Sequence, residues 1–518
     1  MKRKTIITKL LDFDHDDDII VFPQNRTLYV DQFTDEAPTS DEDRKGFKPR
    51  NMKDVFEHYR PKVEGVLLKT EDGECIYEDF YFRSIEDFDD TRLILQSELL
   101  STQKAKMDIY NELIRKFQFL HEEAFLRKSK KHKAELEQWI KSFELKGKEE
   151  SEILAGFKKE RDRAKECLRE NLYVIREKIQ KLEKTYRALD SFFANAGRDK
   201  VDFLTLMNVD HGELNEYDSE GTLAIRDELE RYYGRLSLTK KNYSLVVIPG
   251  YLGDGYALRM WAQTAYKNKA IMVTDFRDVP EFPILKELLE QANLQGQDSY
   301  LANIIMTCNY LVGRKRSELA DEEEDLFIPG SAALAGRLTD TETMSISEAA
   351  TGRKGILNNV SGVRLDLRKA EIASLIDLGM IPMVVVEGCT MAFSSQTLYN
   401  GATKALRDYP FVRTIDWIGK VIQYFINTEI FVLWNALKSE LSQFIHDFLS
   451  DYKGPGKAID GYTMKRIEQD PITKDIKVVV WLKLPANEKY YSLELNAHQV
   501  EYGLEWEEII TLVNEDNY

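Results

Sequence analysis

Short apolar runs alternate with helix-like patterns in the second half of the chain. Five of these runs have the length and composition of buried strands: Asp202–Val209, Tyr243–Pro249, Ala270–Asp275, Ala302–Cys308 and Ile381–Glu387. Helical spacing separates them, for example at Tyr256–Lys267 and Leu285–Ala292. Apolar strands separated by helices are typical of a sheet covered on both faces. The pattern therefore predicts an α/β core over residues 198–417.

Residues 91–197 have a different pattern, which predicts a helical hairpin or coiled coil. No proline occurs between Pro61 and Pro249, and Glu, Lys, Arg and Leu dominate. A 4-3-4-3 spacing of apolar residues forms a seam: Leu168, Leu172, Ile175, Ile179, Leu182, Tyr186, Leu189 and Phe193. Heptad spacing predicts two helices packed side by side. The partner helix could belong to the same chain, with a turn near Gly147 and Gly156, or to another chain.

The first ninety residues divide into an extended arm with a linker, 1–50, and a small α+β unit, 51–90. The arm combines the acidic run Asp12–Asp18 with an extended segment. That segment, which could be an edge strand or could pair with another subunit, includes Thr27, Leu28, Tyr29 and Val30. In the second unit, a short helix ends before Pro61, and two strands are joined through the turn Glu71–Gly73.

Residues 418–518 combine a long helix with strands. A broad apolar stripe predicts one helix over Gly419–Ser450. Strands are predicted at Tyr462–Gln469, Ile476–Leu484 and Tyr490–Asn496. A peripheral strand leaves unpaired backbone groups, which can template strand addition from a neighbour. The candidates for such an exchange are Tyr490, Tyr491, Ser492, Leu493, Glu494, Leu495 and Asn496.

Composition argues against several classes of protein. The 518 residues include 89 acidic and 72 basic side chains, a net charge of -17, whereas a general nucleic-acid binder is basic. The four cysteines form no CxxC pair, so neither a disulfide framework nor a zinc site is expected. The basic N-terminal edge is too short for a secretory signal, and no apolar stretch has the length of a membrane helix. We expect a cytoplasmic protein that does not insert into a membrane.

Candidate chemistry is limited to one glycine-rich turn, Gly250–Gly255. It follows a predicted strand and precedes a helix, where backbone amides can bind phosphate. Its glycine spacing matches neither the Walker nor the Rossmann order, so a structural turn is favoured. The seven histidines show no HExxH or HxH spacing. The sequence therefore favours a protein that is not an enzyme and has no cofactor. A nucleotide-binding enzyme that uses this turn, and a coiled-coil scaffold or adaptor, remain as alternatives.

Several segments resemble a known family, the large subunit of the type VI secretion contractile sheath. The similar segments are Ala188–Phe193, Asp202–Leu214, Tyr243–Gly250, Ile476–Pro485 and Tyr490–Ala497. Two others, Met52–Tyr59 and Phe82–Phe88, are similar to the small sheath subunit. Both kinds of segment occur here in one chain, which could be a divergent branch or a natural fusion.

The resemblance implies a phage-tail-sheath-like fold and a structural role. Copies would form a tubular lattice around an inner tube and contract to propel it. The implied partners are other copies of the chain, a small sheath subunit, the inner tube protein, the baseplate and a Clp-type unfoldase. Tyr490–Asn496 would be the exchanged strand, with the segment near Arg26–Asp31 as its recipient or donor. Glu440, Asp447 and Asp451 are candidates for contact with the inner tube.

Overall fold

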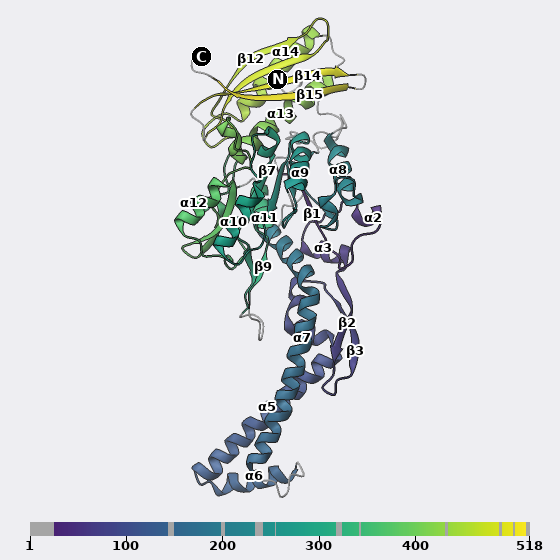
Figure 1. Cartoon of the computed structure of the whole chain (residues 1–518), viewed down its shortest axis with the longest axis vertical. Coiled ribbons are helices and arrows are strands. Elements are labelled where there is room, and N and C mark those ends of the chain that lie inside the picture. Colours follow the sequence, from purple (N-terminus) through teal and green to yellow (C-terminus); the bar gives the residue numbers. More distant parts are fainter. Residues whose placement is uncertain are drawn as a thin grey trace, which may run out of the picture. The chain divides into compact units, whose positions relative to one another are not determined.

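A computed structural model describes residues 25–142, 150–197, 203–233, 242–253, 255–316, 324–340, 343–429, 434–485, 489–500 and 503–513. The chain forms two compact units, drawn in Figure 1. Unit 1 contains Met1–Asp54, Thr185–Arg314 and Leu326–Tyr518, and unit 2 contains Val55–Lys184 and Lys315–Asp325. The acidic run Asp12–Asp18 and Gly147 lie outside the described residues. Gly156, the other residue of the predicted turn, lies inside the helix Glu150–Asn195, so a turn at that position is wrong.

Unit 1 is built around a seven-stranded sheet in the order β11-β10-β7-β6-β5-β1-β4. Its strands are β1 (Thr27–Asp31), β4 (Leu204–Asn208), β5 (Leu245–Val247), β6 (Ile271–Asp275), β7 (Ile304–Cys308), β10 (Met380–Val386) and β11 (Cys389–Ala392). All neighbours are parallel except β10 and β11. Every residue of β4, β5, β6 and β7 is buried, as expected for parallel strands covered on both faces. The predicted α/β core is confirmed.

The prediction that the segment Thr27–Val30 is an edge strand or an arm for another subunit is wrong, because β1 is an interior strand of this sheet. Thr27 pairs with Leu204 on one side and with Leu245 on the other. All five residues of β1 are buried. Both edges of the strand are used within the chain, so the segment Thr27–Val30 has no free edge to offer another subunit.

Helices connect the strands of unit 1. They are α2 (Asp41–Arg44), α8 (Glu220–Tyr233), α9 (Gly255–Lys267), α10 (Phe282–Ala292), α11 (Gly330–Thr339) and α12 (Lys369–Asp377). α11 is rich in Gly and Ala and lies against β5, β6 and β7. A Cβ on Gly336 would come within 2.3 Å of the carbonyl oxygen of Phe192, so only glycine permits this close approach. A short antiparallel pair, β8 (Leu311–Arg314) and β9 (Leu326–Ile328), completes this part.

The C-terminal part of unit 1 differs from the predicted single long helix. Two helices are present, α13 (Tyr409–Glu429) and α14 (Trp434–Asp451). The ring of Trp417 lies 5.2 Å from that of Phe448, and the ring of Phe425 lies 4.2 Å from that of Phe444. These pairs require antiparallel helices. Each helix buries its own apolar stripe against the other, so the sequence shows apolar residues at helical spacing along both helices.

A four-stranded antiparallel sheet follows these helices, in the order β12-β13-β14-β15. Its strands are β12 (Gly461–Gln469), β13 (Ile476–Lys483), β14 (Tyr491–Val500) and β15 (Gly503–Leu512). Three of them overlap the predicted strands, whereas β15 was not predicted. β14 alternates buried and half-buried residues over most of its length, as expected for a strand with one face on a core. Phe411 of α13 contacts Tyr491 of β14, with ring centroids 4.8 Å apart.

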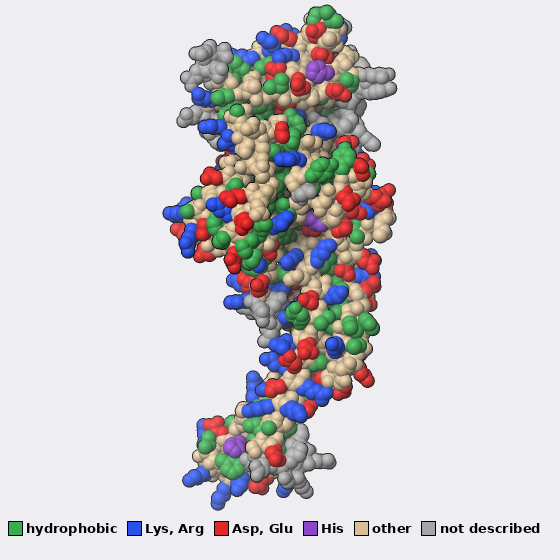
Figure 2. Space-filling model, viewed as in Figure 1, with side chains coloured by type: hydrophobic (Ala, Val, Ile, Leu, Met, Phe, Trp, Pro, Cys, Tyr) green, Lys and Arg blue, Asp and Glu red, His purple; other side chains and the backbone are tan. Residues whose placement is uncertain are grey.

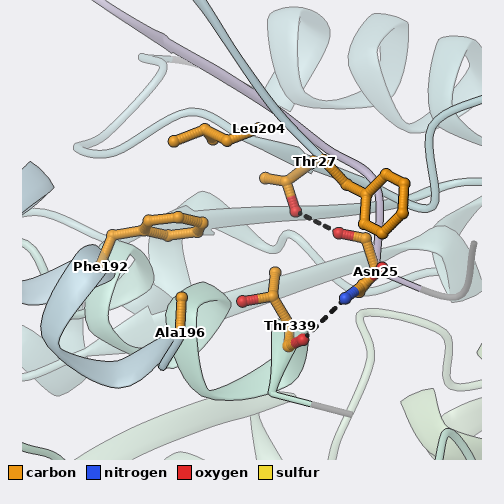
Figure 3. A pocket seen from close by; sticks show the side chains of 7 residues that line it. Asn25, Thr27, Phe192, Ala196, Leu204 and Thr339 are labelled. Atoms are coloured by element: carbon orange, nitrogen blue, oxygen red, sulfur yellow. Dashed lines mark hydrogen bonds between the residues drawn. The ribbon is translucent and has the colours of Figure 1, made fainter. Parts of the chain in front are cut away.

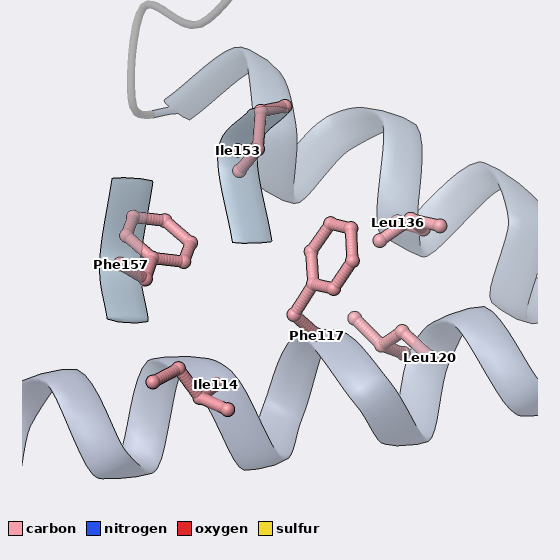
Figure 4. Close-up of a cluster of buried hydrophobic side chains, with 6 residues drawn as sticks. All are labelled: Ile114, Phe117, Leu120, Leu136, Ile153 and Phe157. Carbon is pink, nitrogen blue, oxygen red and sulfur yellow. The ribbon is translucent and has the colours of Figure 1, made fainter. Parts of the chain in front are cut away.

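Unit 2 combines a strand pair with long helices. Its elements are α3 (Met52–Tyr59, whose first turn belongs to unit 1), β2 (Lys62–Lys69), β3 (Cys75–Tyr81), α4 (Asp90–Gln96), α5 (Glu98–His121), a π-helical turn η2 (Glu122–Leu126), α6 (Lys130–Ser142) and most of α7 (Glu150–Asn195). Figure 4 shows a core cluster that α5, α6 and α7 share: Ile114, Phe117, Leu120, Leu136, Ile153 and Phe157. The α+β unit predicted at 51–90 and the helices predicted at 91–197 therefore belong largely to one unit.

Candidate assembly surfaces

The terminal sheet presents two outer edges, formed by β12 and β15. Within the described ranges, no strand pairs with the outer side of either. β12 has a bulge between Met464 and Arg466, and a bulge with charged side chains is a common protection against edge pairing. β15 pairs with β14 without a bulge over all of its ten residues. β15 is therefore the less protected edge.

Alternate residues of β15 direct their backbone groups to this outer edge. The N–H of Val513 donates to the carbonyl oxygen of Tyr490 (3.0 Å), and the N–H of Gln499 on β14 donates away from β15, to Asp475 Oδ1 (3.1 Å). Because backbone groups alternate in an antiparallel pair, odd-numbered residues of β15 bond to β14 and even-numbered residues point outward. The residues whose backbone N–H and C=O groups point to the outer edge are Leu504, Trp506, Glu508, Ile510 and Leu512. They form a ready template for another strand.

A buried cluster of charges attaches β15 to the α/β core. Glu508 forms an ion pair with Lys269, and the two side chains are only 7% and 9% exposed. Lys269 Nζ also lies 4.0 Å from Asp416 Oδ1 on α13. On the same helix, Lys420 Nζ donates a hydrogen bond of 2.7 Å to the carbonyl oxygen of Tyr243. The edge strand is thus connected through charged side chains to two segments of the core that are distant in sequence.

Burial shifts the pKa values of this cluster in opposite directions. Loss of solvent raises the pKa of Asp416 to about 6, although the charges of Lys269 and Lys420 act to lower it. Loss of solvent lowers the pKa of Lys420 to about 7, while Asp416 acts to raise it. Burying charges costs solvation free energy, which the ion pairs offset only while every partner is present. The attachment of β15 therefore depends on an intact set of partners.

The predicted exchange strand lies inside the terminal sheet. Tyr490 directly precedes β14, and the residues from Tyr491 to Asn496 lie within it, paired with β13 on one side and with β15 on the other. The prediction of a peripheral strand at this position is wrong, because β15 covers its outer edge. The alternation of Leu504 and Trp506 with Glu505 and Glu507 is the sequence signal that could have revealed β15.

The remaining predicted site residues lie on helices. Glu440 and Asp451 are exposed on α14, and Asp447 is half-buried and accepts a hydrogen bond of 2.8 Å from Gln443 Nε2. The residues of the predicted seam are all buried within the chain: Leu168, Leu172, Ile175, Ile179, Leu182 and Leu189. Their burial fits the intramolecular alternative for the seam.

The glycine-rich turn at Gly250 is occupied by a side chain of the protein. The N–H of Gly250 donates to Asp275 Oδ2 (2.9 Å), and the N–H of Ser331 donates to Asp275 Oδ1 (2.9 Å). The hydroxyls of Ser331 and Thr307 also donate to this carboxylate. Burial raises the pKa of Asp275, although these hydrogen bonds act to lower it. The amide of Gly250 is thus already used by a carboxylate of the same chain, which favours the structural turn.

A small hollow opens at the start of β1 (Figure 3). Its volume is about 220 Å³, including open solvent, and it is lined by Asn25, Thr27, Phe192, Ala196, Phe203, Leu204 and Thr339. Asn25 Nδ2 donates to the carbonyl oxygen of Thr339 (3.0 Å). None of the lining residues titrates, so the hollow lacks the groups that acid–base catalysis needs.

Two features are absent from the described residues. No helix in this part of the chain is long and apolar enough to cross a membrane. Among the same residues, no group of three or more His, Cys, Asp or Glu side chains is arranged to hold a metal ion.

Several solved structures of contractile sheaths are similar to this chain at a distance. The sheath tail protein from Desulfitobacterium hafniense is 11% identical over 54% of this chain and 60% of its own, with a TM-score of 0.37. The helical sheath of the anti-feeding prophage in its contracted state is 16% identical over 58% and 79%, with a TM-score of 0.40. The PVC sheath complex of an extracellular contractile injection system, also contracted, is 14% identical over 59% and 77%, with a TM-score of 0.39.

These likenesses are too distant to support an argument, and no curated protein matches the sequence. Two family models do match. The model of the type VI secretion system TssC/VipB central domain covers residues 174–400, and the model of the TssC/VipB-like C-terminal domain covers residues 408–511. The two models describe consecutive parts of one family and together cover well over half of the chain. The chain therefore belongs to the TssC/VipB family of the type VI secretion system.

Proposed function

We propose that copies of this chain form the wall of a tube and are linked by strand addition at the outer edge of β15. As a member of the TssC/VipB family, the chain is a structural sheath subunit of a contractile injection system. The tube would surround an inner tube in the cytoplasm and propel it by contraction. This role needs no catalytic step and no cofactor.

The single observation that carries the proposal is the regular outer edge of β15, the less protected of the two edges of the terminal sheet. It offers outward-pointing backbone groups over ten residues, with neither a bulge nor a proline. Ile509 and Leu512 are 38% and 44% exposed on the same strand, so an added strand would also find apolar contacts. Main-chain hydrogen bonds supply the affinity in strand addition, and side-chain contacts supply the specificity. The edge lies within residues 408–511, which match the family's C-terminal domain.

The buried pair between Glu508 and Lys269 suits a joint that carries force. A strand from a neighbouring copy, once added to β15, would be connected through Glu508 to Lys269 and to α13. Backbone hydrogen bonds persist when the two bodies that they join rotate relative to each other. Neighbouring copies could therefore reorient during contraction and remain connected.

Further partners follow from the family and belong to the same proposal. A small sheath subunit, the inner tube protein, the baseplate and a Clp-type unfoldase would each contact the assembled sheath. The exposed carboxylates Glu440 and Asp451, with Asp447 beside them on α14, remain our candidates for contact with the inner tube.

A proline at Ile510 tests the proposal. The N–H of Ile510 points to the outer edge, so Ile510→Pro removes a donor from the template and leaves the hydrogen bonds to β14 in place. Ile510→Ala is the matched control, because it shortens the same side chain and retains the N–H. We expect Ile510→Pro to abolish tubes in electron micrographs and to retain the helical circular dichroism of the wild type, whereas Ile510→Ala forms tubes. Tubes formed by Ile510→Pro would refute strand addition at this edge.

A further inference from the structure

An exposed surface that is both basic and apolar lies where α5, η2 and α6 meet in unit 2. The sequence from Phe125 to Lys133 contains five basic residues and no acidic residue. All five are exposed: Arg127, Lys128, Lys130, Lys131 and Lys133. Phe119, Phe125 and Leu126 are 56%, 45% and 74% exposed. We call Phe119 and residues 125–133 the basic tip.

The basic tip is one continuous surface. The ring of Phe119 lies 5.9 Å from that of His132, and the next residue, Lys133, places its ammonium 5.9 Å from the ring of Phe125. Figure 2 shows Lys and Arg side chains gathered at this end of unit 2. A cluster of large exposed apolar side chains surrounded by charge is typical of an interaction surface. Its partner should be acidic, with apolar side chains of its own.

A complementary surface lies on unit 1 of the same chain. The exposed stripe of α8 contains Glu220, Leu223, Asp227 and Glu230 at helical spacing. Three further exposed acids, Asp41, Glu42 and Asp43, lie on α2, which packs against α8. Leu223 and the nearby Tyr217 are 42% and 45% exposed. We call the residues named in this paragraph the acidic face, and Figure 2 shows acidic side chains gathered over α2 and α8.

A buried arginine holds the acidic face together. Arg44 of α2 is 3% exposed and forms ion pairs with Glu213 (2.9 Å) and with Glu220 (2.8 Å). The helix α2 is thereby fixed beside α8, and the outer acids remain exposed. The basic tip and the acidic face thus have opposite charge, and each contains exposed apolar side chains.

We propose that the basic tip of one copy docks on the acidic face of a second copy. The chain has a net charge of -17, so the basic tip is a local exception that other copies of the chain can attract. The two surfaces differ, so their contact is heterologous, and a heterologous contact extends into rings or helical assemblies. The inference rests on the proposed function, because it adds a second contact to the same lattice.

Charge reversal in both directions tests the contact in the full-length protein. Lys128→Glu with Lys131→Glu lowers the charge of the basic tip from +5 to +1, and Asp227→Lys with Glu230→Lys lowers that of the acidic face from -6 to -2. We expect each pair of changes to raise the protein concentration needed for tube formation roughly tenfold. Combining all four leaves the weakest attraction and should raise this concentration further than either pair alone. The matched control reverses two exposed lysines elsewhere on α7, Lys165→Glu with Lys178→Glu, and should change nothing.

Disulfide trapping detects the contact between the basic tip and the acidic face directly. A chain with both Leu126→Cys and Leu223→Cys should form covalent multimers in assembled tubes under mild oxidation, and either change alone should not. Tubes without these multimers, together with a wild-type assembly concentration in the fourfold variant, would overturn the docking and leave the proposed function standing. Absence of any self-association would overturn both. A third outcome would assign the basic tip to a membrane and also overturn the proposal. In that outcome no multimers form, and the protein binds phosphatidylserine vesicles. The basic-tip variant loses this binding and the acidic-face variant retains it.

Discussion

Replacing Glu508 with Gln removes one charge from the buried cluster that attaches β15 to the core. The side chain keeps its size, so packing is preserved and only the ion pair with Lys269 is lost. Lys269 then stays buried, with Asp416 Oδ1 4.0 Å from its ammonium. We expect this change to loosen β15 and α13 and to leave unit 2 unaffected.

The expected magnitude follows from the burial and the distances of the three charges. Glu508 and Lys269 are 7% and 9% exposed, so solvent screens them little. Removing one partner of a buried ion pair costs about 3–5 kcal/mol. Asp416 remains 4.0 Å from Lys269 Nζ and retains part of the attraction. We therefore expect the low end of that range, about 3 kcal/mol, or roughly a 150-fold change in the local opening equilibrium.

Hydrogen exchange followed by mass spectrometry measures this local opening. Peptides from β14, β15 and α13 should exchange roughly 150-fold faster in Glu508→Gln than in the wild type, because their amides open more often. Peptides from α5 and α7 in unit 2 provide an internal reference and should exchange at the wild-type rate.

Glu505→Gln is the matched control, because Glu505 is exposed on the same strand. Neutralising a surface charge changes stability by about 0.5 kcal/mol or less. If Glu508→Gln and Glu505→Gln give exchange rates within about threefold of each other, the ion pair does not hold β15 and our account of the anchor is wrong.

Two further predictions concern stability. Phe117→Ala removes a ring from the shared core of α5, α6 and α7, where Phe117 is 3% exposed. Hydrogen exchange should show that this change lowers the stability of unit 2 by about 3–5 kcal/mol. Phe119→Ala, at an exposed position, should lower it by less than about 0.5 kcal/mol, and equal losses of stability in the two variants would contradict the cluster. The folded-state pKa of Lys420 is lowered to about 7, so the unfolded chain binds the extra proton between pH 7 and about 10 and stability should rise with pH across that window. Urea titrations at several pH values should show this rise in the wild type and a smaller rise in Lys420→Met. Equal slopes would contradict the lowered pKa of Lys420.

The α/β core was predictable because its strands are buried on both faces. Each predicted apolar run overlaps one observed strand, from Leu204–Asn208 to Met380–Val386. The interior position of β1 was not predictable, because its partners β4 and β5 lie far along the chain and a short apolar strand has the same local pattern inside a sheet or at its edge. Local sequence therefore identifies a strand but not its neighbours.

The attachment of β15 to the core was even harder to predict from the local sequence. A glutamate on an edge strand is expected to face solvent, yet Glu508 is buried against Lys269, which is 239 positions away in sequence. The apolar stripe of α13 and α14 suggested one helix, because a stripe does not reveal where two antiparallel helices pack on each other. The helical seam in α7 was easier to predict, since heptad spacing is a local property.

Electron cryomicroscopy of tubes assembled from the purified protein, with a candidate small subunit where assembly requires one, would show directly whether β15 joins neighbouring copies. We expect the terminal sheet to gain a further strand from a neighbouring copy, hydrogen-bonded to the outward-pointing groups of β15 between Leu504 and Leu512. Tubes in which this edge of β15 faces solvent would contradict this expectation.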